Sequence, residues 1–130
     1  MASLFERIPE QVFIETLATF LQPVKHFLDD TSVSEILING PDEIYYEKRG
    51  TLHKSDARFA SLEDLEGLCQ NLAQYVGKTL TLEKPFLEAR LPDGSRVAVV
   101  APPASRTGLT VSIRRFSRER LRPEQLINWG

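Results

Sequence analysis

The sequence predicts an α+β fold, in which an antiparallel sheet with packed helices is preceded by an N-terminal helical segment. Helical periodicity of the apolar residues is confined to two stretches, before residue 29 and after residue 61, and short β-prone runs separated by turn residues fill the rest. The 130 residues, 42% hydrophobic and 26% charged, have the size and composition of one globular domain.

The first element is an amphipathic helical segment from Pro9 to Leu28. Its apolar residues recur at spacings of three and four, which places them on one face of a helix. Pro9 suits a first helical turn, but Pro23 lies inside the pattern, where a proline removes a backbone hydrogen bond. We therefore expect two helical pieces in a lead-in that covers residues 1–29.

Three strands are expected next. Residues 35–39 and 43–47 are β-prone runs on either side of the turn formers at 40–42. A second turn at 48–51 leads to Leu52 and His53, which form the third strand. Short strands joined by tight turns predict a three-stranded meander.

A second helix is expected from Leu62 to Tyr75. Ser61 provides an N-cap hydroxyl before the acidic first turn, and Gly77 provides the C-cap. The residues on its apolar face are Leu65, Leu68, Leu72 and Val76.

Three more strands are expected at 87–91, 96–101 and 109–116, the first two joined by the turn Pro92-Asp93-Gly94. They form a second antiparallel group, onto which the second helix packs. The strand residues expected to meet that helix are Val97, Val99, Val111 and Ile113. Pro123 is expected to begin a further helix.

Basic residues are concentrated at the C-terminal end. Residues 90–130 carry eight basic side chains, all Arg, against three acidic ones, although the whole chain has a formal net charge of -2. Arg presents a planar fork of donors that suits phosphate and carboxylate, so an all-Arg cluster indicates anion recognition. The net charge does not favour nucleic acid as a partner.

Four of these arginines lie on the predicted strands. Arg90 and Arg96 flank the turn, and Arg114 and Arg115 lie on the following strand, so antiparallel pairing brings several guanidinium groups to one surface. The apolar alternation breaks at the Arg pair, so at least one of the two is expected to point inward or toward an interface. The alternative is two solvated charges at a strand end.

Other candidate motifs favour structural roles. Gly77-Lys78-Thr79 ends like a P-loop, but the loop's first glycine is replaced by Leu72 and the triplet follows a helix, so we interpret it as a C-cap. His26 and His53 lack partners at metal-ligand spacing, and no metal site is expected. Cys69 lies among the apolar residues of the second helix and is interpreted as a core residue.

No apolar run approaches the roughly 20 residues that span a bilayer, and residues 1–10 lack the pattern of a secretory signal. We expect a cytoplasmic protein that reaches a membrane only through partners.

Five short motifs follow one another along the chain. Residues 33–41 read VSEILINGP and residues 44–50 read IYYEKRG. Residues 89–97 read ARLPDGSRV, a Pro-Pro pair follows at 102–103, and residues 110–116 read TVSIRRF. In this order the motifs resemble those of the type II/type IV secretion ATPases, and especially of the tight-adherence pilus branch. The resemblance extends from about residue 24 to residue 129.

This resemblance implies a PAS-like amino-terminal domain over residues 30–121, with residues 122–130 beginning a linker to a catalytic domain. In the family, nucleotide lies between the two domains. The family's arginines that reach the nucleotide phosphates correspond here to Arg96 and Arg114, with Arg90 and Arg115 as second choices.

The resemblance also implies partners: the protein's own catalytic domain, neighbouring subunits of a homohexamer and an inner-membrane secretion platform protein. ATP and Mg²⁺ are expected in the full-length protein only, and no cofactor is expected in this fragment. The 130 residues contain no Walker A or Walker B motif, so no catalytic residue is assigned and hydrolysis by the chain alone is not expected. The alternative is a stand-alone module that binds an anion or a protein without motor activity.

Overall fold

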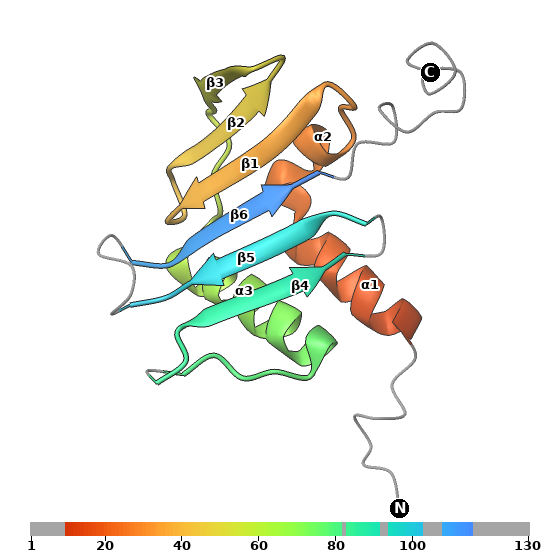
Figure 1. Ribbon diagram of the computed structural model, residues 1–130, viewed down its shortest axis with the longest axis vertical. Coiled ribbons are helices and arrows are strands. Elements are labelled where there is room, and N and C mark those ends of the chain that lie inside the picture. The colour runs from red at the N-terminus through yellow and green to blue at the C-terminus, as the bar shows by residue number, and fades with distance from the viewer. Residues whose placement is uncertain (1–9, 82, 92–93, 103–107, 116–130) are drawn as a thin grey trace, which may run out of the picture.

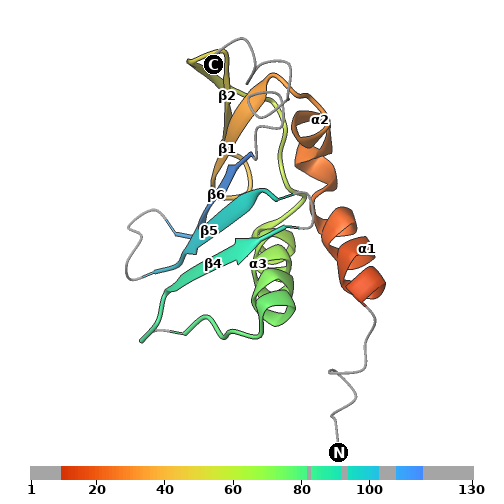
Figure 2. The same cartoon turned by 45° about the vertical axis from the view of Figure 1, so that its right-hand side comes forward.

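Among the residues that the structure describes, six strands form one antiparallel sheet, and the helices lie on one of its faces (Figures 1 and 2). The computed structural model describes residues 10–81, 83–91, 94–102 and 108–115. The strands are ordered β3-β2-β1-β6-β5-β4 across the sheet. The predicted α+β class, with an antiparallel sheet and packed helices, is confirmed, and the description of the fold as PAS-like stays a prediction.

The N-terminal segment is divided at Pro23, as predicted. Helix α1 spans Glu10–Phe20, a 3-10 turn (η2) spans Gln22–Val24, and helix α2 spans Lys25–Leu28. The division follows from the missing N–H of proline, which cannot continue the helical hydrogen-bond ladder. Among the side chains that the structure describes, this segment contributes four buried residues to the core that it shares with the sheet and helix α3; they are Leu17, Leu21, Val24 and Phe27.

The predicted meander is confirmed by strands β1 (Val33–Asn39), β2 (Ile44–Lys48) and β3 (Thr51–Lys54). The turn between β2 and β3 consists of Arg49 and Gly50, whose φ angles are 52° and 80°. Positive φ at both central residues is the geometry of a two-residue hairpin whose twist matches that of its strands.

Helix α3 spans Leu62–Val76, one residue beyond the predicted end. The Ser61 hydroxyl accepts a hydrogen bond from the Asp64 N–H at 3.2 Å, and Gly77 closes the helix in the left-handed conformation. The interpretation of Gly77-Lys78-Thr79 as a C-cap is therefore confirmed. Helix α1 crosses α3 at Gly67, where an added Cβ would lie 2.7 Å from the Phe20 ring.

The last three strands are β4 (Phe86–Arg90), β5 (Arg96–Val100) and β6 (Thr110–Arg114), close to the predicted ranges. The two predicted antiparallel groups are joined by pairing of β6 with β1, which creates a single sheet. Pro92, Asp93, Phe116 and the predicted helix at Pro123 lie outside the described residues.

The predicted core is confirmed. Each of the helix and strand residues expected to meet is at most 2% exposed: Leu65, Leu68, Leu72, Val97, Val99, Val111 and Ile113. Cys69 is buried beside them, and burial raises the pKa of its thiol to about 12. A thiol that stays protonated is a poor nucleophile, so its interpretation as a core residue holds.

Candidate functional site

In the part of the chain that the structure describes, no helix covers the second face of the sheet. Because side chains alternate along a strand, Val111 and Ile113 of β6 point into the core, whereas Ser112 and Arg114 point to the open face. The helices stand behind the sheet in Figure 1 and to one side of it in Figure 2. The open face is therefore available for a ligand or another domain.

Three arginines form a row across the open face, which we call the arginine row. Arg90 on β4 lies directly opposite Arg96 on β5, and Arg96 lies directly opposite Arg114 on β6. Neighbouring strands are about 4.8 Å apart, so the row spans roughly 10 Å. All three side chains are exposed, and no carboxylate among the described residues lies within ion-pair distance of them.

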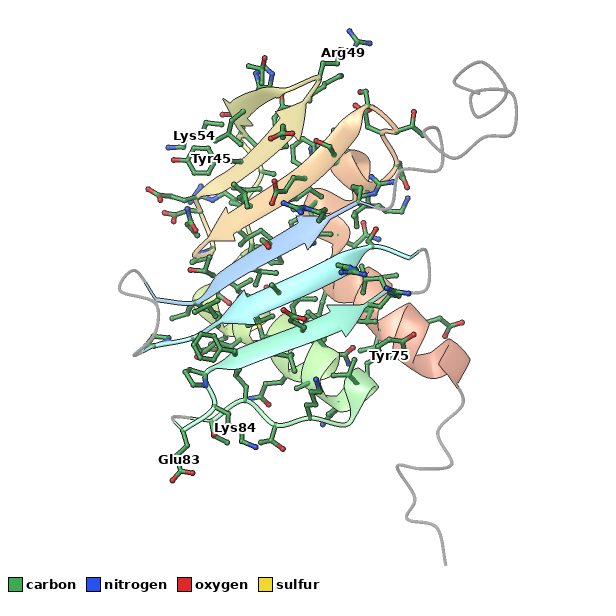
Figure 3. All side chains as sticks on the ribbon, viewed as in Figure 1. Tyr45, Arg49, Lys54, Tyr75, Glu83 and Lys84 are labelled. Carbon is green, nitrogen blue, oxygen red and sulfur yellow. The ribbon has the colours of Figure 1, made fainter. Side chains whose placement is uncertain are left out.

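Beyond the arginine row, the next two cross-strand positions on the other half of the sheet are acidic. Glu35 on β1 is the cross-strand partner of Arg114, and Glu47 on β2 is the partner of Glu35. The Ser34 hydroxyl donates a hydrogen bond to the Glu47 carboxylate at 3.0 Å. Farther along the same face, Tyr45 and Lys54 lie side by side on β2 and β3 (Figure 3). Along the cross-strand positions occupied by Arg114, Glu35 and Glu47, the charge therefore changes sign where β6 meets β1.

A groove of about 600 Å³ contains the arginine row, and we call it the arginine groove. It lies at the end of β4 and β6, the start of β5 and the loop after α3. Its lining combines four cations with two carboxylates and is completed by small or apolar residues; the charged residues are Lys78, Arg90, Arg96, Arg114, Glu35 and Glu88. A multiply charged anion is the ligand that such a lining attracts.

Arg115 lies apart from the row and points toward helix α2. Its Nη1 donates to the carbonyl oxygen of Phe27 at 2.9 Å and approaches that of Asp30 at 3.5 Å. The expectation that one residue of the Arg pair points inward is thus confirmed. Of the four arginines predicted from the sequence, the structure brings three together, and the fourth contacts the end of α2 and the loop that follows it.

That loop is held by a second set of polar contacts. The Asp30 carboxylate accepts hydrogen bonds from the Ser32 N–H at 2.9 Å, the Ser32 hydroxyl at 2.6 Å and the Lys48 ammonium at 3.2 Å. These bonds, chiefly those from Ser32, lower the pKa of Asp30 to about 2. Asp30 is therefore a structural carboxylate, which ties the loop to strand β2.

The two histidines are joined by a series of rings. The ring centroids of His26 and Phe27 are 3.9 Å apart, those of Phe27 and Tyr46 are 4.5 Å apart, and those of Tyr46 and His53 are 5.1 Å apart. Two rings thus separate the imidazoles. The described part of the chain contains no group of three or more His, Cys, Asp or Glu side chains arranged to hold a metal ion.

Sequence reasoning did not place Glu35 or Lys78 in the groove. Glu35 lies beside Arg114 because of the register in which β1 pairs with β6. Strand register could have identified Glu35 only if that pairing had been known. Lys78 was assigned to a helix cap, and its place in the groove depends on how α3 ends relative to β4. In the segments that the structure describes, no helix is both long enough and apolar enough to cross a membrane.

The fold and the motifs together define a class, the amino-terminal domain of a secretion-system ATPase. The chain is homologous to this domain of the type IV secretion proteins VirB11 and PtlH. It is 32% identical over 120 residues to VirB11 of Bartonella quintana, with 89% of this chain and 34% of that protein covered. It is 32% identical over 99 residues to PtlH of Bordetella pertussis, with 75% of this chain and 29% of that protein covered.

Solved structures agree with the sequence comparison. The VirB11 ATPase of Brucella suis, in complex with sulphate, superimposes with a TM-score of 0.82 at 27% identity, over 93% of this chain and 36% of that protein. The ATPase DotB of Legionella pneumophila shares the fold, with a TM-score of 0.55 at 18% identity over 87% of this chain and 34% of that chain. No family model matches the chain. The chain spans about a third of the length of the relatives it matches.

Proposed function

We propose that this chain is the regulatory and assembly domain of a motor ATPase that drives secretion or pilus assembly. In this role Arg96 and Arg114 bind the phosphates of a nucleotide held between this domain and a catalytic domain. The observation that carries the proposal is the arginine row, three exposed guanidinium groups on adjacent strands of an uncovered sheet face.

The energetics of the row support a ligand. Like charges directly opposite one another on neighbouring strands destabilise a sheet, so the row costs the isolated domain some stability. A bound polyphosphate removes this cost because each guanidinium group then donates charge-assisted hydrogen bonds to an anion. The crystal of VirB11 in complex with sulphate is a further support, because that relative binds an anion of phosphate-like shape.

Binding between two domains also explains how the site would act in a motor. In a cleft from which water is largely excluded, an arginine that touches a terminal phosphate interacts differently with ATP and ADP. That difference biases the relative orientation of the two domains and turns hydrolysis into rigid-body movement. In this proposal ATP and Mg²⁺ act in the full-length protein, and this chain supplies only the arginine side of the site.

The proposed assembly follows from the family. The partners are the protein's own catalytic domain, neighbouring copies in a homohexamer and an inner-membrane platform protein, with the motor in the cytoplasm. Arg90 is a secondary phosphate contact at the edge of the row. Arg115, a secondary choice from the sequence, has less support for this role because its guanidinium group already binds the carbonyl group of Phe27.

The second candidate function is a stand-alone module that uses the same groove to hold an anion or an acidic protein segment. The clustered, unpaired arginines favour it equally well, so the gene itself distinguishes the two. A G-x-x-x-x-G-K-[ST] segment encoded downstream of residue 130 supports the motor, and its absence supports the module.

Turnover of the full-length protein tests the proposed role of the arginines. Arg96→Ala and Arg114→Ala should each reduce ATP hydrolysis about ten- to a hundredfold, because each removes a charge-assisted bond to the transferred phosphate. Arg58→Ala, at an exposed arginine outside the groove, is the matched control and should leave turnover unchanged. Normal turnover in both groove variants, with the fold intact, would exclude phosphate contact by these residues.

A further inference from the structure

We infer that Lys78 is a further anion-binding residue, which contacts the phosphates in the arginine groove from the helix side. This inference rests on the proposed function of the groove. The three arginines reach the groove from strands β4, β5 and β6, whereas Lys78 reaches it from the loop that follows α3. A ligand in the groove would therefore meet cations on two sides.

The backbone of Lys78 is fixed by the end of the helix. Gly77 adopts a φ of 70°, its N–H donates to the Gln74 carbonyl oxygen at 3.1 Å, and the Lys78 N–H donates to that of Ala73 at 2.8 Å. This is the usual pattern of a helix that ends in a left-handed residue. The side chain therefore starts from a defined position at the edge of the groove.

The ammonium group of Lys78 is available for a ligand. The side chain is exposed and makes no ion pair with any residue that the structure describes. The negative end of the α3 dipole favours a cation at this position. An ammonium group is a compact charge with three donors, which complements the planar, two-pronged donors of the arginines on the opposite side.

Lys78 also changes the charge of the groove. Its lining holds Glu35 and Glu88 as well as the arginine row, so two of the three arginine charges are offset by carboxylates. Lys78 doubles the excess positive charge that remains. This excess positive charge favours the binding of a chain of phosphates with several negative charges over that of a single monoanion.

The Gly-Lys-Thr triplet thus contributes to phosphate binding by a route that differs from a P-loop. In a P-loop, backbone N–H groups at a helix N-terminus surround the phosphate. Here the triplet lies at a helix C-terminus, where the carbonyl groups repel an anion, and only the long lysine side chain reaches it.

Titration of the 130-residue chain with inorganic tripolyphosphate tests the inference. Binding is followed at low ionic strength by the amide NMR shifts of the groove residues, which detect millimolar affinity. Lys78→Gln should weaken binding about three- to tenfold, and Lys78→Arg should restore it to within about twofold of the wild type. Lys84→Gln is the matched control, because Lys84 is exposed on the same loop but does not line the groove.

The outcomes separate this inference from the proposed function. If Arg96→Gln weakens binding and Lys78→Gln matches Lys84→Gln, the arginine groove stands and the role of Lys78 is overturned. If Lys78→Arg binds as weakly as Lys78→Gln, the loss is not one of charge, and the inference again fails. If the wild type shows no shifts in the groove at millimolar tripolyphosphate, both the phosphate role of the groove and that of Lys78 fail.

Discussion

Arg96 and Arg114 lie directly opposite each other on β5 and β6, both exposed on the uncovered face of the sheet. Two like charges at a cross-strand position work against the pairing of their strands. Buried residues on the other face, Val97 and Ile113 among them, hold these strands together. The core therefore stabilises a surface that the charges alone would disfavour.

This arrangement predicts that Arg96→Gln does not destabilise the domain. Removal of the central charge of the row relieves repulsion with both neighbours, so the free energy of unfolding should stay the same or rise by a few tenths of a kcal/mol. The gain should shrink in high salt, which screens exposed charges. Urea unfolding at low and high ionic strength measures both effects, and Arg58→Gln is the control. A clear loss of stability would show that Arg96 supports the fold.

Arg115→Gln should have the opposite effect. The Arg115 guanidinium group bonds the Phe27 carbonyl at 2.9 Å, and a hydrogen bond from a charged donor is worth about 1.5–3 kcal/mol. Because the side chain is half-buried, we expect a loss of about 1.5 kcal/mol, at the low end of that range. Arg114→Gln, one residue earlier and exposed, should change the free energy of unfolding by less than about 0.5 kcal/mol. Equal effects in the two variants would contradict the assigned roles.

Local signals account for most of the fold that the sequence predicted. Ser61 and Gly77 mark the ends of α3, Pro23 divides the N-terminal helices, and turn residues separate the strands. Each of these depends on the conformational preference of a few neighbouring residues. The pairing of β1 with β6 has no such signal, because it joins strands about 75 residues apart and depends on long-range packing.

In the site, too, some features follow from local signals and others from long-range packing. The arginines were found from their residue type and their position beside a turn, and the register of β4, β5 and β6 explains why Arg90, Arg96 and Arg114 align. Strand alternation sends Arg115 to the other face, toward α2. Its partner there is a backbone carbonyl, which leaves no mark in the sequence. Glu35 and Lys78 join the groove only through tertiary structure.

Asp30 predicts an acid-sensitive step in stability. Its pKa is about 2 in the folded chain against an ordinary value of 3.8, so the ionised carboxylate stabilises the folded state. This contribution is complete above the unfolded pKa and is lost as the pH falls from about 4 to 2. Asp30→Asn should therefore lower stability at neutral pH and reduce its pH dependence between these values. The urea midpoints of the wild type and the variant, measured across this pH range, check the prediction. If the two midpoints fall by the same amount as the pH is lowered, Asp30 does not have this role.

The contact between α1 and α3 predicts a coupling between Gly67 and Phe20. A glycine inside a helix costs about 1 kcal/mol relative to alanine, so Gly67→Ala should stabilise α3 if nothing else changes. In the wild type the new Cβ would lie 2.7 Å from the Phe20 ring, which must move and give up packing against the core. The gain should therefore be small or reversed.

On a Phe20→Ala background the ring is absent, and Gly67→Ala should recover most of the 1 kcal/mol that helix propensity provides. The difference between the two backgrounds is the coupling energy, which we expect to be at least about 0.5 kcal/mol, as is usual for residues in contact. Urea unfolding of the wild type, both single variants and the double variant measures it. If Gly67→Ala has the same effect on both backgrounds, Phe20 does not pack on Gly67, and α1 does not cross α3 at this position.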